Sequence, residues 1–80
     1  SYTVEEGFTA SSDGYLNVYV NPSTEDGSYI ILSIGGRYLT GNNSNNGHGY
    51  SVIATCKRGD RVTILEGNNC AQSTWYYTEI

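Results

Sequence analysis

The sequence predicts one all-β domain, folded as a compact antiparallel β-sandwich. Ten glycines and eight tyrosines occur among 80 residues, together with many asparagines, a composition typical of short strands joined by tight turns. No segment carries a sustained apolar repeat of about 3.6 residues, the pattern of an amphipathic helix. The length suffices for a single domain, residues 1–80. Because the chain begins at Ser1 rather than Met, we expect a fragment or processed product of a longer protein.

Turn signals divide the chain into short runs rich in β-branched and aromatic residues. We expect turns at Asp13-Gly14, Asn21-Pro22, Asp26-Gly27, Gly35-Gly36, Asn46-Gly47, Arg58-Gly59-Asp60 and Gly67-Asn68. We expect strands near Tyr2–Val4, Phe8–Ala10, Tyr15–Val20, Tyr29–Ile34, Arg37–Thr40, Tyr50–Cys56, Arg61–Leu65 and Thr74–Thr78.

Alternation of side chains along a strand assigns the two faces, because residues two apart lie on the same side. One face of the two longest apolar runs carries Leu16, Val18, Val20, Ile30, Leu32 and Ile34. The opposite face of the same runs carries Tyr15, Tyr19, Tyr29 and Ile31. A sandwich of this size has one interior, so the second apolar face needs a different cover. An oligomer interface is the simplest cover.

The last run, "TWYYTEI", has aromatic side chains on both faces. Alternation puts Trp75 and Tyr77 on one side of the strand and Tyr76 on the other. We expect one side to reach the core and the other to reach an interface or a ligand, with packing preferred over a sugar-binding platform.

The formal net charge of −4, from eight acidic and four basic residues, argues against nucleic-acid binding, which depends on Lys and Arg contacts to phosphates. Three of the basic residues, Lys57, Arg58 and Arg61, crowd around one turn. The sequence contains no apolar run long enough to span a membrane and no signal peptide. We therefore expect neither nucleic-acid binding nor membrane insertion.

The tripeptide Arg58-Gly59-Asp60 is known as an integrin-adhesion signal, but it also has the composition of a turn. Apolar residues alternate before it, in 52–56, and after it, in 62–64, which predicts a strand on each side. Gly59 can supply the backbone conformation of a tight turn, and Asp60 can bond its own backbone. We therefore predict a structural turn rather than an adhesion motif.

The segment Gly41–Gly49, "GNNSNNGHG", is too polar and glycine-rich to pack and predicts a surface loop. Loops on a rigid β scaffold often carry recognition. Asn42-Asn43-Ser44 fits the N-glycosylation sequon, but a chance match is the preferred interpretation in an Asn-rich loop. The candidate ligand-binding residues in and around this loop are Tyr19, Tyr38, Asn42, Asn43, Asn45, Asn46, His48 and Tyr50.

Cys56 and Cys70 are the only cysteines, and both are expected near strand ends. A disulfide between them, which would stabilise the fold by up to about 3 kcal/mol, and two unbonded apolar thiols both fit the sequence. Two cysteines and one histidine are too few for a structural zinc site. His48 lies between glycines, without the nucleophile and orienting carboxylate of a catalytic histidine. We predict no metal, no cofactor and no enzymatic activity.

Four segments together carry a resemblance to a known family. They are "GFTASSDGYLNVYV" (Gly7–Val20), "YIILSIGGRYL" (Tyr29–Leu39), "YSVIATCKRGDRVTI" (Tyr50–Ile64) and "TWYYTEI" (Thr74–Ile80). They resemble the small C-terminal jelly-roll domains of bacteriophage tail fibres and tail proteins, which are similar to the complement-C1q and tumour-necrosis-factor fold. The chain departs from the pattern at Ser11, where the family frequently has Pro after Thr-Ala.

The resemblance implies a C-terminal domain at the tip of a tail fibre in the virion, or otherwise extracellular. It further implies a homotrimer without catalytic activity that attaches the phage to its host. The receptor would be a glycan or a protein of the bacterial surface. Tyr and Asn side chains suit a glycan, since a ring can stack on a sugar and an amide can pair with hydroxyls.

A second resemblance stays open. "LNVYVNPST", "VIATCKRGDRVTILEG" and the final "WYYTEI" are also similar to bacterial SH3-like domains that bind cell walls. This alternative, an SH3-like barrel, treats residues 26–49 as a large insertion. The insertion would contain "SYIILSI", one of the best strand patterns in the chain.

Overall fold

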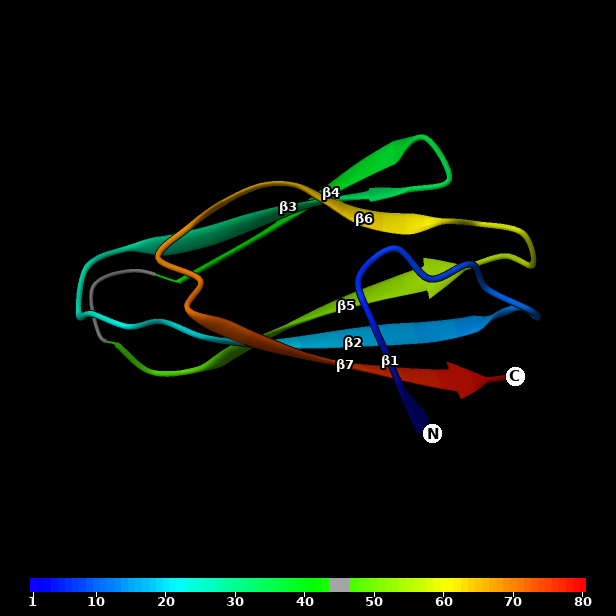
Figure 1. The fold of residues 1–80 in the computed structure, drawn as a ribbon, viewed down its shortest axis with the longest axis horizontal. Coiled ribbons are helices and arrows are strands. Elements are labelled where there is room, and N and C mark those ends of the chain that lie inside the picture. Colours follow the sequence, from blue (N-terminus) through cyan, green and yellow to red (C-terminus); the bar gives the residue numbers. More distant parts are fainter. Residues whose placement is uncertain (44–46) are drawn as a thin grey trace.

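The computed structural model describes residues 1–43 and 47–80 and consists of two antiparallel sheets packed face to face (Figure 1). The strands are β1 (Tyr2–Val4), β2 (Gly14–Asn21), β3 (Ser28–Ile34), β4 (Arg37–Asn43), β5 (Tyr50–Cys56), β6 (Val62–Asn68) and β7 (Gln72–Glu79). One sheet has the strand order β1-β7-β2-β5 and the other the order β4-β3-β6. No helix occurs in the described ranges. The predicted all-β fold is therefore confirmed.

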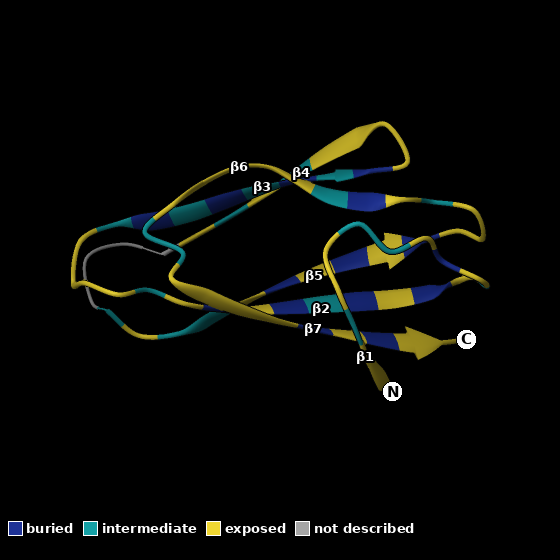
Figure 2. Ribbon diagram, viewed as in Figure 1, coloured by how far each residue is buried: buried dark blue, intermediate teal, exposed yellow. Residues whose placement is uncertain are grey.

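The core lies between the two sheets and contains the apolar faces that alternation predicted (Figure 2). The buried apolar and aromatic residues are Ala10, Leu16, Val18, Val20, Ile30, Leu32, Ile34, Val52, Ala54, Cys56, Val62, Trp75 and Tyr77. Trp75 and Tyr77 point inward from β7 and Tyr76 points outward, which resolves the aromatic end of the chain. Phe8 packs edge-on against Tyr77, with ring centroids 5.3 Å apart.

The expected strand at Phe8–Ala10 is not a regular strand. Thr9 forms one isolated antiparallel bridge with Arg61, and Val62 exchanges backbone hydrogen bonds with the same segment, donating to Phe8 O at 3.0 Å. The segment therefore runs along the outer edge of β6 without forming a ladder. It links β1, in the four-stranded sheet, to the edge of the three-stranded sheet and closes that side of the sandwich.

A bulge interrupts the pairing of β3 with β6. Leu32 pairs with Ile64 and Ile31 pairs with Glu66, so Leu65 has no partner of its own. The strand expected over Arg61–Leu65 is therefore irregular after Ile64, and Leu65 is 56% exposed. Strands β4 and β6 also continue beyond their expected ends.

Asn69 fastens the loop between β2 and β3 to the end of β6. Its backbone adopts a positive φ of 54°, and its side-chain oxygen accepts hydrogen bonds from the backbone N–H groups of Ser23, at 3.0 Å, and Thr24, at 3.2 Å. Its Nδ2 donates to the carbonyl oxygens of Thr24 and Asp26. The side chain of Asn69 thus supplies hydrogen-bond partners for the backbone of the loop between β2 and β3.

The turn at 57–60 has the structural role that the sequence predicted for it. Gly59 has a φ of 91°, and the Asp60 carboxylate accepts a hydrogen bond from the backbone N–H of Lys57 at 2.9 Å. The same carboxylate lies 3.3 Å from Nη2 of Arg37. Asp60 is thus engaged within its own domain, which is unfavourable for an adhesion motif.

The Cys56–Cys70 disulfide is not formed, because both thiols are free. Cys56 pairs with Gly14 at one end of β2. The sulfur of Cys70 lies 4.0 Å from the hydroxyl of Tyr50, whose partner Val20 is near the other end of β2. The distance along β2 between these ends is about 20 Å, far beyond the Cα separation of about 7 Å that a disulfide tolerates.

The insertion required by the SH3-like alternative is not peripheral. Residues 26–49 contain β3, which is the central strand of the three-stranded sheet and pairs with both β4 and β6. Ile30, Leu32 and Ile34 of this strand are core residues. Removing the segment would remove half of the sandwich interior, so this architecture disfavours the alternative.

Tyr77 links stability to alkaline pH. Its hydroxyl donates to the carbonyl oxygen of Ser12 at 2.6 Å. Burial raises the pKa of Tyr77 from 10.0 to about 12. The acidic groups of Cys56, Tyr2, Asp13 and Glu79 add to this shift, because their negative charges disfavour a tyrosinate nearby. The folded state therefore holds this proton more tightly than the unfolded chain, and the resulting stability is present below pH 10 and lost as pH rises toward 12.

We expect the melting temperature to fall steeply above pH 10 and the tyrosine titration of the folded protein, followed by ultraviolet absorbance, to end with one late-titrating group. Tyr77→Phe should remove that late group and flatten the alkaline fall in stability. If the Tyr77→Phe protein still shows the late-titrating group, that group belongs to another tyrosine.

Candidate functional site

The outer face of the four-stranded sheet carries no charge. We call it the uncharged face; its residues are Thr3, Tyr15, Asn17, Tyr19, Asn21, Ser51, Ile53, Thr55, Gln72, Thr74, Tyr76 and Thr78. Its central row runs straight across the sheet, from Thr3 through Tyr76 and Asn17 to Ile53. The chain has twelve charged residues, eight acidic and four basic, so their absence from one whole face is a distinctive feature.

Large side chains on this face remain open to solvent. Tyr15 is 49% exposed, Tyr76 41% and Ile53 63%. Asn17, between them, has a buried side-chain oxygen that accepts no hydrogen bond from the described residues. Alternation correctly placed Tyr15 and Tyr19 opposite the core, but Tyr29 and Ile31, which were expected on the same second face, lie on the other sheet.

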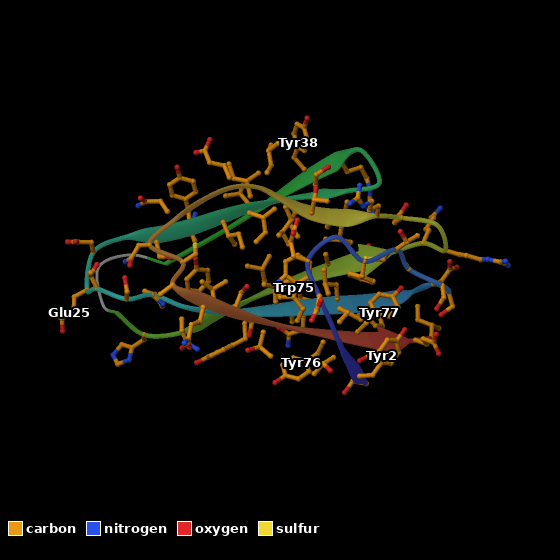
Figure 3. All side chains as sticks on the ribbon, viewed as in Figure 1. Tyr2, Glu25, Tyr38, Trp75, Tyr76 and Tyr77 are labelled. Atoms are coloured by element: carbon orange, nitrogen blue, oxygen red, sulfur yellow. The ribbon has the colours of Figure 1, made fainter. Side chains whose placement is uncertain are left out.

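The opposite broad face belongs to the three-stranded sheet. We call it the Tyr38 face; its residues are Tyr29, Ile31, Ser33, Tyr38, Thr40, Asn42, Thr63, Glu66 and Asn68. Tyr38 projects away from the sandwich on the side opposite Tyr76 (Figure 3) and is 70% exposed. The hydroxyl of Tyr29 donates to the carboxylate of Glu66, and this hydrogen bond raises the pKa of Tyr29.

A groove of about 340 Å³ opens beside Tyr38, between the edges of β4 and β5. Its lining residues are Ile34, Arg37, Tyr38, Leu39, Ile53, Ala54 and Thr55. Nη2 of Arg37 spans it, donating to the carbonyl oxygen of Thr55 at 3.2 Å. The groove has the volume, the mostly apolar walls and the few polar groups of a small-ligand site.

The predicted ligand-binding residues do not form one site. Tyr38 and Asn42 lie together on the Tyr38 face, whereas Tyr19 lies on the uncharged face with its ring and hydroxyl against Gly49. Tyr50 is half-buried between the sheets and bonds Ser28 Oγ at 2.7 Å, where burial raises its pKa. Tyr50 therefore contributes to the contact between the two sheets.

The loop residues are only partly described. His48 borders a shallow hollow of about 310 Å³ that it shares with Pro22 and Glu25. Asn43 pairs through its backbone with Ser28 at the end of β4, and nothing further is described of its side chain. Asn45 and Asn46 lie outside the described residues.

The candidate ligand-binding residues predicted from the sequence did not include Tyr15, Asn17 and Ile53 on one face or Tyr29 on the other. Tyr76 was expected at an interface or a ligand if Trp75 and Tyr77 reached the core, and it does lie on the outer face. Alternation did place Tyr15 opposite the core. The neighbourhood of Ile53, Asn17 and Tyr76 depends on β2 lying between β5 and β7, which no local pattern reveals.

Across residues 1–43 and 47–80, no group of three His, Cys, Asp or Glu side chains could hold a metal ion. The same part of the chain contains no helix with the length and apolarity needed to cross a membrane. Comparison with protein-family models, curated proteins and solved structures finds no match to this chain.

Proposed function

We propose that this domain is a non-catalytic receptor-binding module, the tip of a bacteriophage tail fibre, which works as a homotrimer and recognises a component of the bacterial surface. The observation that carries the proposal is the Tyr38 face. It presents one highly exposed ring among hydroxyl and amide side chains. Rings and neutral hydrogen-bonding groups suit a sugar surface.

The pairing of the strands supports a jelly roll as the finer description of the fold. The pairs are nested: β1 with β7, the segment 7–10 with the edge of β6, β2 with β5, and β3 with β4. This is the pattern of one long antiparallel hairpin rolled into two sheets, as in eight-stranded jelly rolls. The segment 7–10 takes the position of a strand that is too short here to form a ladder.

A trimer would let three weak sites act on one bacterial surface. An open contact surface binds weakly by itself, and linking three equivalent sites raises the effective concentration of the second and third contacts. The sequence resemblance supports this assembly, as does the exposed apolar area on the uncharged face.

Replacing Tyr38 by Ala tests the recognition surface. We expect fluorescently labelled Tyr38→Ala protein to bind host cells, or their purified surface polysaccharide, at least about tenfold more weakly, since an exposed ring at the centre of a contact typically contributes 1–2 kcal/mol or more. Tyr38→Phe keeps the ring and should retain most of the binding. Because Tyr38 is 70% exposed, the melting temperature of both variants should stay unchanged.

Unchanged cell binding by Tyr38→Ala would contradict the assignment of this face. A parallel pull-down on purified peptidoglycan separates the proposal from a general cell-wall-binding module. The fibre-tip proposal expects no general affinity for peptidoglycan, and strong retention there would favour the cell-wall alternative.

A further inference from the structure

Two features of the four-stranded sheet have no role within a single chain: its uncharged outer face and its open β5 edge. We propose that three copies join head to tail, with the β5 edge of one copy pairing with the β1 edge of the next. The three sheets then form a closed ring with the uncharged faces turned inward. This inference rests on the homotrimer proposed above and assigns its interface.

The β5 edge is unprotected, unlike the outer edge of β6. Segment 7–10 covers the start of β6, and the bulge and Glu66 interrupt it further along. Residues 50–56 contain no charge, no proline and no shift of register. Natural sheet edges carry such devices to prevent pairing with other chains. Arg37 bonds the carbonyl oxygen of Thr55 near one end of the β5 edge, and the open side of 51–53, with which no described residue pairs, indicates a partner strand.

Hydrogen-bonding groups on this edge point outward. The carbonyl oxygen of Thr55 accepts a bond from Arg37 and so faces away from β2. Residues two apart orient their backbone groups alike in an antiparallel strand. Ser51 and Ile53 therefore also direct their N–H and C=O groups to the open side, where no described residue pairs with them.

Strand direction allows a head-to-tail junction. Successive strands in the order β1-β7-β2-β5 are antiparallel, so a continued sheet would set β1 of the next copy antiparallel to β5. Thr3 is the middle residue of β1 and Ile53 the middle residue of β5. Both lie on the uncharged face, on the same row at opposite edges of the sheet.

The dimensions fit three copies. Strands in a sheet are about 4.8 Å apart, so four strands with one junction give a side of about 19 Å. The centre of a triangle with that side lies about 5.5 Å from each side, close to half the spacing of about 10 Å between packed sheets. Side chains of the uncharged faces would therefore fill the interior without a wide channel.

The chemistry of the face fits a second and third copy of itself. Identical surfaces meet around the axis, so any charge there would oppose its own kind, and the face has none. The face is about 19 Å wide and, over the eight residues of β2 and of β7, about 27 Å long, so each copy brings about 500 Å² to the interior in addition to its two strand edges.

Charge substitutions at the two edges test the ring. Ile53 is 63% exposed and Thr3 is exposed, so neither change should prevent folding. We expect sedimentation and light scattering to give a mass of three chains for the native protein at micromolar concentration. Ile53→Lys alone and Thr3→Glu alone should each reduce it to one. The double variant should return to three chains, because each junction then joins Lys to Glu.

Two controls separate this result from general damage. Leu65→Lys adds the same charge at an exposed site on the other sheet and should remain a trimer. Ser51→Pro removes one outward N–H without adding charge and is tolerated at an edge, yet it should weaken the trimer. Circular dichroism and thermal melting report whether each variant is folded.

The outcomes distinguish the two proposals. A native trimer that persists in folded Ile53→Lys would overturn the ring and leave the homotrimer standing. A native dimer, or a double variant that stays monomeric while each single variant is folded, would indicate a different junction and overturn the ring. A native monomer would overturn both the ring and the trimer, while the Tyr38 experiment would still decide the recognition surface.

Discussion

Gly14→Ala is expected to destabilise the domain by about 3 kcal/mol or more, enough to leave much of this small protein unfolded at 37 °C. A Cβ atom at Gly14 would lie 2.2 Å from the backbone oxygen of Thr78 and 2.9 Å from the ring of Tyr77. The obstacle is backbone and a fully buried ring, so neither can move aside cheaply. The change should also disturb the Tyr77 hydroxyl, which bonds Ser12 at 2.6 Å.

Gly67→Ala is the matched control for this prediction. Gly67 also lies in a strand, but its added Cβ would meet Cys70 at 3.5 Å, an ordinary contact. We expect a change within about 0.5–1 kcal/mol, favourable if anything, because Ala loses less backbone entropy on folding than Gly. Denaturant titration of both variants measures the difference, and equal losses would mean that β2 and β7 are not packed as closely as the structure has them.

This glycine illustrates how much of the fold could be predicted. The sequence identified Asp13-Gly14 as a turn, because the dipeptide is a common turn signal. In the structure Gly14 is instead the first residue of β2, where the Thr78 oxygen and the Tyr77 ring of the paired strand β7 leave no room for a side chain. The local sequence marked Gly14 as a special position. The requirement for glycine there, however, comes from a contact with residues far apart in the chain, Tyr77 and Thr78.

The inner and outer faces of the strands were predictable and the sites were not. Alternation alone assigned Leu16, Val18 and Ile30 to the core, since the period of a strand is independent of its neighbours. Tyr19 and Tyr38 looked equivalent as exposed aromatic residues, yet they lie on opposite sheets. Which tyrosines share a surface depends on strand order, and the pairs that set the order join residues widely separated in sequence.

The sequence left a disulfide and two free thiols open for the same reason, and the structure has the free thiols. Both lie near strand ends, but Cys56 belongs to the end of β2 near Gly14 and Cys70 to the opposite end. Burial raises the pKa of the Cys56 thiol, which keeps it protonated and apolar in the core.

Leu32→Ala is expected to be the most damaging change in the three-stranded sheet. Leu32 is fully buried at the centre of β3 and faces the inner side chains of the other sheet. Truncating such a side chain typically costs about 3–4 kcal/mol, from lost burial and the remaining cavity. For a domain of this size we expect the melting temperature to fall by roughly 15 °C.

Leu65→Ala removes the same atoms from the next strand and should cost less than about 0.5 kcal/mol. The bulge between Ile64 and Glu66 removes Leu65 from the pairing with β3 and leaves it 56% exposed. Without the bulge, Leu65 would pair with Ile31 and would still face outward, whereas Glu66 and the residues after it would move to the opposite face, because a slip of one residue moves side chains to the other side of the sheet. Calorimetry of the two leucine variants therefore tests whether Leu65 lies outside the core. Similar losses at both positions would place Leu65 inside the sandwich and would contradict its 56% exposure.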